Sequence, residues 1–438
     1  MKLTLVAFLK VALLQVALLS SVVAQAGLIS PCRDPIVLPG PKVQVFILPV
    51  QSESRLTENG RQLATILQRH VLFAALKYRS IAIEELTGDP RECGLAETID
   101  MVRHRLGADQ AAIFLSTRLF EQADALQLQS NVTLWLPGTL ATTTWRLGAS
   151  ARVSNASLPA ASPASSANEA VAFQPRRIPL SFVSTLADAQ REARRLHTQP
   201  DSNSAFSTLP DDPHARIGFE VLETTGDWLH VRLFPEQRDG WISAHALVGG
   251  DELKGTFPEL FFVDGLIGYL QLLVPAAPGA PALRATTADT AIGALNKYLE
   301  LTSDRGESEA RALATVLQGL ATLRVGTSAQ WSLPILADAQ RYFSRARELA
   351  PGSTLANNFY LACAAAICAR GGCPASADGL HAQYLAALAQ DPTSVELLNN
   401  LDALYAAAQR GIIKLSIAPR AIAAQRALAR EAGAANAP

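Results

Sequence analysis

Two segments near the C-terminus repeat the same spacing of an apolar residue, a large aromatic residue, an alanine and a proline, at intervals of four, three and five residues. Small residues let paired helices approach closely, the large residue fills the gap between successive pairs, and proline ends the helix. Residues 257–438 are therefore predicted to form an all-α array of stacked helices. The repeated positions are Ala339, Phe343, Ala346 and Pro351, and then Leu380, Tyr384, Ala387 and Pro392.

These segments resemble the second helix of a tetratricopeptide repeat. Leu401 and Tyr405 fit the first helix of such a repeat, although Asp402 stands where that family has glycine. The 41 residues from Pro351 to Pro392 exceed the usual repeat of about 34, and the extra residues fall in CARGGCPASADG. The resemblance implies a TPR-like array with a concave groove for a peptide or helix.

The N-terminus has the pattern of a cleavable signal peptide. Lys2 and Lys10 supply positive charge, residues 11–19 are apolar, and Ala24-Gln25-Ala26 is a small-x-small cleavage site. An uncleaved anchor is the alternative, but Lys10 and Gln15 interrupt the apolar run that a membrane span needs. Residues 1–26 are therefore predicted to be removed, which would place the mature chain in the periplasm or outside the cell and not in the membrane.

Export to an oxidising compartment favours disulfides over metal ligands for the five cysteines. Cys32 and Cys93 bracket the first domain, and Cys368 and Cys373 flank a tight Gly-Gly loop. Two disulfides, Cys32–Cys93 and Cys368–Cys373, are expected, with Cys363 buried and unpaired. A zinc site of cysteines alone would need four thiolates.

The remaining length is enough for several domains. A Ser/Ala/Pro-rich run at residues 154–170 predicts a linker, and residues 154–190 are assigned to a linker and connecting segment. The expected domains are an α/β domain over 27–153, a small β-barrel over 191–250 and the helical array over 257–438. The fold class is therefore multidomain α+β.

Apolar strand patterns alternate with helical ones between residues 43 and 153. They predict a sheet with helices on one face, in which the segments ALQLQSNVTLWL and TTTWRLGASARV form a hairpin. The strand ending at Leu48-Pro49, the Leu-rich helix after it, and Leu106-Gly107-Ala108-Asp109 before AAIFLS resemble the N-terminal domain of TolB and its relatives in curli-secretion and penicillin-binding-protein-activator lipoproteins. The resemblance implies a domain that contacts other envelope proteins and has no catalytic site.

Residues 219–247 contain short alternating strands separated by Gly-Asp and Asp-Gly turns, as a small β-barrel requires. They resemble a bacterial SH3-type domain, whose Gly-x-Trp-x-x-Val and Gly-Trp-Ile strands match two runs here. Upstream, His197 or Thr198 stands where that family has arginine. The resemblance implies a surface for wall peptides, glycans or proline-rich segments, and core packing is the alternative role of the tryptophans. The candidate binding residues are Trp228, His230, Arg232 and Trp241.

Catalytic signatures are absent from the mature sequence. It has no Gly-x-Ser-x-Gly elbow, no His-Glu-x-x-His and no phosphate-binding glycine loop, and no cofactor or metal is implied. His104 with Cys93 lacks an orienting third residue, and Glu84 and Glu85 would point to opposite faces of a strand. Lys and Arg number 38 against 39 for Asp and Glu, so no basic field favours nucleic acid.

Three functions follow from these patterns. The first is a non-catalytic scaffold or adaptor of the cell envelope that binds proteins or peptides. The second is a peptidoglycan-binding regulator of a wall synthase or hydrolase. The third is an enzyme without a recognisable motif, for which no residue can be named.

Overall fold

The computed structural model describes most of the chain after residue 33. The described ranges are 34–52, 78, 81–86, 94–122, 125–136, 144–146, 152–154, 160–161, 170–179, 195–209, 218–243, 257–273, 281–325, 332–373, 376–418 and short pieces between 420 and 431. The predicted signal peptide, Cys32 and Cys93 lie outside these residues, so export and the first disulfide stay predictions.

A large mixed sheet is built around β1 (Val43–Ile47). β1 pairs in parallel with β3 (Ile81–Glu85) on one side and β4 (Ala111–Gln122) on the other. β5 (Ala125–Trp135) then pairs antiparallel with β4, and β10 (Arg176–Pro179) pairs with β5 at the edge. Every residue of β1 is buried because both faces of the sheet are covered, which explains its unbroken apolar run.

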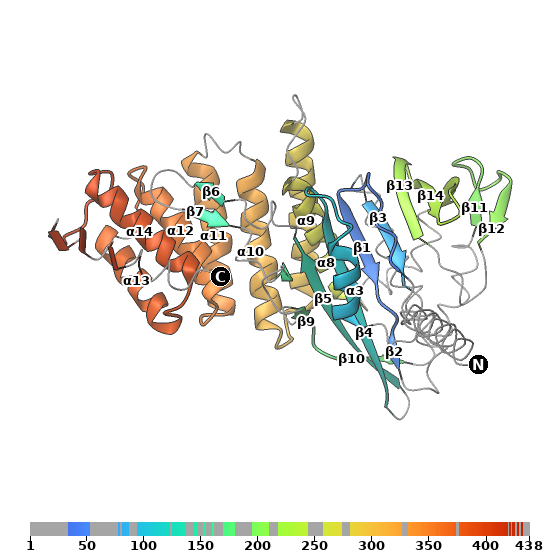
Figure 1. The fold of residues 1–438 in the computed structure, drawn as a ribbon, viewed down its shortest axis with the longest axis horizontal. Coiled ribbons are helices and arrows are strands. Elements are labelled where there is room, and N and C mark those ends of the chain that lie inside the picture. Colours follow the sequence, from blue (N-terminus) through green and yellow to red (C-terminus); the bar gives the residue numbers. More distant parts are fainter. Residues whose placement is uncertain are drawn as a thin grey trace, which may run out of the picture.

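Helices lie on both faces of this sheet, which corrects the expectation of one covered face. Phe46 and Phe114 stack with ring centroids 5.4 Å apart and pack with Val102 of α3 (Leu95–Arg103). On the opposite face, Val45 and Ile113 share a core with α8 (Pro258–Leu273). α8, the first helix of the predicted array, packs against α9 and α10 and is buried at nearly every position between the sheet and the other helices, its acidic residues Glu259 and Asp264 included (Figure 1).

The expected hairpin between residues 125–136 and 142–153 is not formed by the described residues. β5 instead pairs along its length with β4, which immediately precedes it. β6 (Thr144–Arg146) and β7 (Arg152–Ser154) pair with each other in a separate two-stranded ribbon. β4 and β5 are separated by two residues in sequence, so their antiparallel pairing has a low entropic cost of loop closure. Pairing of β5 with the more distant segment would require a longer loop to close.

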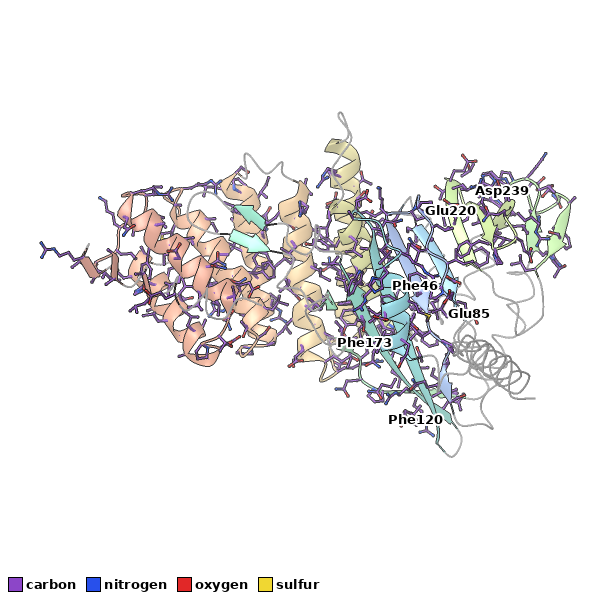
Figure 2. All side chains as sticks on the ribbon, viewed as in Figure 1. Phe46, Glu85, Phe120, Phe173, Glu220 and Asp239 are labelled. Atoms are coloured by element: carbon purple, nitrogen blue, oxygen red, sulfur yellow. A yellow bond between two sulfur atoms is a disulfide. The ribbon has the colours of Figure 1, made fainter. Side chains whose placement is uncertain are left out.

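The segment expected to be a linker contains strands. Besides β10, this segment contains β8 (Ala160–Ala161) and β9 (Ala170–Ala172), which both pair with β5. Outside this segment, the short strand β2 (Gln51–Ser52) pairs with β4. Phe173, which is labelled in Figure 2, packs edge-on against Phe262 and Tyr298 with ring centroids 5.5 and 5.9 Å away. Part of residues 154–190 thus belongs to the sheet and its core.

The strands predicted to form a small barrel extend the same sheet. β13 (Gly218–Thr225), β14 (Trp228–Phe234) and β15 (Arg238–Ser243) follow one another antiparallel, then β11 (Arg195–His197) and β12 (Phe206–Thr208). β13 also pairs with β3, where Phe219 stands opposite Ile83. Gly226, with φ 54°, makes the turn between β13 and β14. Strands of both predicted domains thus share one sheet. The domain boundaries and the barrel stay predictions.

Helices fill the C-terminal part of the chain, so the predicted mixed α and β fold with a helical array is confirmed. Each described helix packs against the next along the chain, and Figure 1 shows the array extending away from the sheet. After α8 the helices are α9 (Pro281–Leu301), α10 (Ser308–Val325), α11 (Leu333–Leu349), α12 (Thr354–Cys368), α13 (Ala377–Gln390) and α14 (Val395–Gln409).

Two helix junctions in this array have the same geometry. Ala350 after α11 has φ −139° and ψ 80°, and Asp391 after α13 has φ −137° and ψ 84°. The next helices both begin at a serine N-cap: Ser353 accepts from the backbone of Ala356, and Ser394 from that of Leu397. The recurring sequence thus corresponds to a recurring local structure. The predicted packing residues Ala339, Phe343, Ala346, Leu380, Tyr384, Ala387, Leu401 and Tyr405 are all buried, while Pro351 and Pro392 lie just past the helix ends.

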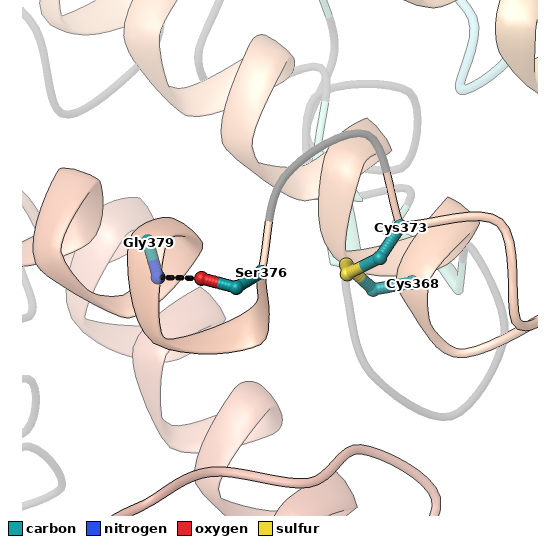
Figure 3. The surroundings of a disulfide bond; sticks show 4 residues. All are labelled: Cys368, Cys373, Ser376 and Gly379. Atoms are coloured by element: carbon teal, nitrogen blue, oxygen red, sulfur yellow. Dashed lines mark hydrogen bonds between the residues drawn. A yellow bond between two sulfur atoms is a disulfide. The ribbon is translucent and has the colours of Figure 1, made fainter.

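The predicted disulfide between Cys368 and Cys373 is present at the end of α12 (Figure 3). Gly371 between them has φ 81°, a conformation that glycine adopts without strain. Ser376 is the N-cap of the next helix, α13, and its hydroxyl accepts from the backbone of Gly379 at 3.0 Å (Figure 3). Cys363 is buried and unpaired, and burial raises the pKa of its thiol.

None of the helices in the described ranges is long and apolar enough to span a membrane.

We expect Gly319→Ala and Gly293→Ala to change stability in opposite directions. A methyl group on Gly319 would lie 2.5 Å from Cε1 of Phe343, whose buried ring stacks on Phe359 and has no room to move. On Gly293, also inside a helix, a methyl group meets nothing within 4 Å. Thermal unfolding followed by circular dichroism should show a loss of about 1–3 kcal/mol at Gly319 and a gain of about 0.5–1 kcal/mol at Gly293. Equal gains at both sites would contradict close packing of α10 on α11.

Candidate functional site

β14 presents different side chains on its two faces. Leu229, Val231 and Leu233 are buried in the core, so the residues between them lie on the opposite face. The residues on that face are Trp228, His230 and Arg232, all only partly buried. The alternation that suggested a binding strand therefore places three of the four candidate residues on a solvent-accessible face.

Neighbouring strands add aromatic side chains to this face. His230 stands opposite Trp241 of β15, and their rings stack at 4.6 Å with an interplanar angle of 12°. His197 of β11, paired opposite Trp241, contacts the ring of Trp228 at 5.1 Å and that of Phe206 at 5.5 Å. We call His197, Phe206, Trp228, His230 and Trp241 the aromatic face.

The edge of the aromatic face is exposed to solvent. Phe206 on β12 is 48% exposed, and the guanidinium of Arg195 lies 4.6 Å from its ring centroid. An exposed aromatic ring offers flat apolar contact to a sugar ring, a proline or another aromatic group. Phe206 is therefore the ring of this face that is most open to contact by stacking.

Arg232, the remaining candidate, is already occupied by carboxylates. Its guanidinium donates to both carboxylate oxygens of Asp239, at 2.9 and 3.3 Å, and lies 3.5 Å from Glu220. The hydrogen bonds and charge of Asp239 raise the pKa of Arg232. Figure 2 labels Glu220 and Asp239 at this end of the molecule. Arg232 thus stabilises the pairing of β13, β14 and β15, and binding an anion would require it to leave these partners.

Close packing behind the face limits how it can vary. A methyl group on Gly240 would lie 2.4 Å from Cγ of Leu196, because β15 passes directly over that buried side chain. The glycine in the Gly-Trp-Ile run therefore allows β11 and β15 to approach. This approach brings His197 beside Trp241.

Sequence reasoning missed His197, Phe206 and Asp239 as members of this region. His197 drew attention only as a departure from a family pattern, and Phe206 lies on a strand too short to show alternation. Asp239 and Gly240 were expected to form a turn, but they lie within β15 and the turn before it falls at residues 235–237. The cross-strand register of Asp239 with Arg232 appears only once the strands pair. A short strand carries little periodic information.

A second polar cluster lies between the sheet and the helices. Arg176 of β10 forms an ion pair with Glu259 of α8 at 2.6 Å, and these side chains are 7% and 1% exposed. Ser130 donates to Glu259 at 3.2 Å. Glu307 lies 4.0 Å from Arg176 and accepts from the hydroxyl of Tyr298 at 2.9 Å. The buried positive charge of Arg176 is therefore balanced by the nearby carboxylates of Glu259 and Glu307.

The pKa shifts of this cluster follow from its burial. Burial raises the pKa of Glu259, and the positive charge of Arg176 opposes that rise. Burial lowers the pKa of Arg176, and the charge of Glu259 opposes that change. Because Arg176 and Glu259 are both almost fully enclosed, the cluster joins β10 to α8 and does not present a surface for substrate.

Within the described ranges, no group of three or more His, Cys, Asp or Glu side chains is arranged to hold a metal ion.

We expect Arg176→Met to destabilise the chain by about 3–5 kcal/mol, because it leaves Glu259 as a buried charge without its cation. The double substitution Arg176→Met with Glu259→Gln should recover part of this loss. Lys297→Met removes an exposed ion pair with Glu300 and should cost less than about 0.5 kcal/mol. Urea unfolding of the three variants measures these differences, and similar costs for Arg176→Met and Lys297→Met would show that the buried pair has no special role.

Comparison with known proteins adds no relative. The chain matches no protein-family model, and it is similar to no curated protein and no solved structure. The function of this chain must therefore be inferred from its own residues.

Proposed function

We propose that this chain is a non-catalytic scaffold or adaptor of the bacterial cell envelope, which binds protein or peptide partners through its TPR-like helical array and its SH3-like strands. The predicted signal peptide supports the compartment. The repeated helix junctions at Ala350 and Asp391 support the kinship of the array with helical repeats. Such arrays commonly bind extended or helical segments of other proteins.

The position of β7 is the observation that carries this proposal. β7 lies against α12 and α14, which are distant from it in sequence and adjacent to each other in the array. We call the side of α12 and α14 that contacts β7 the array surface. It lies against an extended backbone, which is the shape that a bound peptide presents.

α12 lies inside the array. It has no charged residue, and Tyr360 is the single residue between Ala356 and Cys368 that is not buried. A helix that is apolar on all sides is normally enclosed by other elements. α11, α13 and α14 contact α12, and β7 adds to the cover that these helices provide.

A photocrosslinking experiment tests partner binding. The benzophenone amino acid p-benzoylphenylalanine is introduced at Asn399, an exposed residue of α14, in the full-length exported chain. The control position is Arg341 on α11, whose side chain is 80% exposed. After irradiation in periplasm, we expect Asn399 to yield a discrete protein adduct, identified by mass spectrometry, that Arg341 does not yield.

The same adducts at both positions, or none at Asn399, would contradict the assignment of α14 to partner binding. A crosslink within the chain itself is distinguished from a partner by the mass of the adduct.

Peptidoglycan binding is the second candidate function, and the aromatic face favours it. Stacked His230 and Trp241 together with exposed Phe206 present flat rings on neighbouring strands. Rings of this kind stack on the apolar faces of sugars and on the side chains of short peptides. In this role the chain would regulate a wall synthase or hydrolase, with the array holding that enzyme.

Sedimentation with purified sacculi tests the second candidate. We expect the wild-type chain to pellet with sacculi and Phe206→Ser combined with Trp241→Ala to reduce the pelleted fraction at least severalfold, since the stacking rings are lost. Leu385→Ser is the matched control, because Leu385 is 46% exposed on the array against 48% for Phe206. Equal sedimentation of all three proteins, or of none, would exclude wall binding through this face.

A further inference from the structure

β12 lies at one end of the large sheet. Among the described strands, the order of this sheet ends at β10 and at β12, and all three residues of β12 are exposed. Figure 1 shows β11 and β12 at the end of the molecule farthest from the helical array. β10 carries Pro179, which has no backbone N–H to offer a further strand. β12 has neither proline nor lysine, the residues that commonly protect an edge strand, so its edge is open to a neighbour.

The backbone of Phe206 points away from the sheet. The backbone N–H of Thr198 donates to the carbonyl of Ala205 at 2.9 Å, next to the ladder between β11 and β12. Bonded and non-bonded pairs alternate along an antiparallel ladder, so the next pair, His197 and Phe206, is a non-bonded one. On its other side His197 pairs with Trp241 of β15, which agrees with this alternation. The N–H and C=O of Phe206 therefore point to the open side of β12.

Thr208 repeats this orientation two residues later. It stands opposite Arg195, again at a non-bonded position of the ladder. In the described ranges, no hydrogen bond to the outward backbone groups of Phe206 or Thr208 is present. These two residues thus offer N–H donors and C=O acceptors at the two-residue spacing that an added strand requires.

The side chain of Phe206 gives this edge a chemical preference. Phe206 lies on the aromatic face beside His197, and 48% of it is exposed. A residue of an added strand that stands opposite Phe206 has its side chain on the same face, because paired residues share one side of a sheet. Contact with the exposed part of the ring favours an aromatic or other apolar residue at that position.

The surroundings of this edge are acidic. Residues 195–243, which contain the strands from β11 to β15, have eight acidic residues and four basic ones. Asp201 is exposed in the loop that joins β11 to β12, and Asp211 and Asp212 follow β12 in the sequence. Beside the aromatic face, the side chain of Glu223 is 59% exposed. Complementary charge therefore favours basic residues in a ligand of this edge.

A peptide fits the edge better than a second copy of this chain does. Pairing between two copies of β12 would involve three residues from each. Such a contact is much smaller than the roughly 1,200–2,000 Å² that a stable protein interface buries. The acidic surroundings of two copies would also repel each other. A basic peptide avoids this repulsion.

We propose that β12 binds an extended basic peptide of a partner protein as an additional strand of the sheet, with an apolar side chain of that peptide against Phe206. Backbone hydrogen bonds to Phe206 and Thr208 supply the affinity, and the ring and the surrounding acidic residues supply the selectivity. This inference rests on the proposed function and specifies how its SH3-like strands hold a partner.

Thr208→Pro tests strand addition, and Thr208→Val is its matched control. Proline removes the outward N–H of Thr208 but no bond between β11 and β12, whereas valine keeps that N–H. The probe is a fluorescently labelled peptide in which lysine alternates with phenylalanine, titrated by anisotropy with each full-length protein. We expect Thr208→Val to bind it as the wild type does. Thr208→Pro should bind at least about fivefold more weakly, because one backbone hydrogen bond is lost.

Modified peptides test the same edge without altering the protein. Methylation of the backbone nitrogen at every second residue blocks the N–H groups on one side of an extended peptide, and the two alternating patterns block opposite sides. One pattern should abolish binding to the wild type, and the other should retain it. A peptide with glutamate in place of lysine should bind severalfold more weakly.

The outcomes separate this inference from the proposed function. Equal affinity of Thr208→Pro and Thr208→Val, equal effects of the two methylation patterns, or no peptide binding to the wild type would each overturn strand addition. Partner crosslinking at Asn399 on the array would still support the proposed function in these cases. Sedimentation with sacculi without peptide binding would assign the aromatic face to the wall and overturn the inference. Loss of both the peptide signal and the Asn399 crosslink would overturn both proposals.

Discussion

The enclosure of α8 is the constraint on which the remaining structure depends. This helix contacts α9 and α10 and shares a core with the sheet, and it is buried at nearly every position. Gly265 and Gly268 make the close approach possible, since a methyl group on either would lie under 3 Å from Leu295 or Tyr78. An acidic residue on such a helix needs a partner inside the protein, and Arg176 supplies one for Glu259.

This shared core makes the sheet and the first helices one packing unit and separates the two candidate surfaces. The aromatic face lies toward one end of the elongated molecule and the array surface toward the other (Figure 1). Two separate surfaces suit the adaptor function that we propose. The ribbon is the exception to this separation, since it starts from the sheet and ends on the array.

Periodic features were predictable from sequence, and features that depend on long-range pairing were not. Trp228 and His230 were identified because alternation along one strand is a local property, and the repeat positions around Phe343 because helix spacing is local too. Cys368 and Cys373 are close enough in sequence for their pairing to follow from loop length. Arg176 was missed because it lies on a short strand in a polar stretch, and nothing local identifies Glu259 as its partner. The one local sign of this ion pair is Glu259 itself, an acidic residue in the first turn of the apolar helix α8.

Sequence alone established the helical array, the inward and outward faces of β14 and the disulfide at the end of α12, since each depends on residues within one or two elements. The tertiary structure assigned the partners: β13 to β3, α8 to the second face of the sheet, and the ribbon to α12 and α14. Many apolar faces could have covered one another with similar burial energy, because the hydrophobic effect is not directional. Close approach at glycines and the pairing of buried charges select among them, and both are properties of two distant segments in contact.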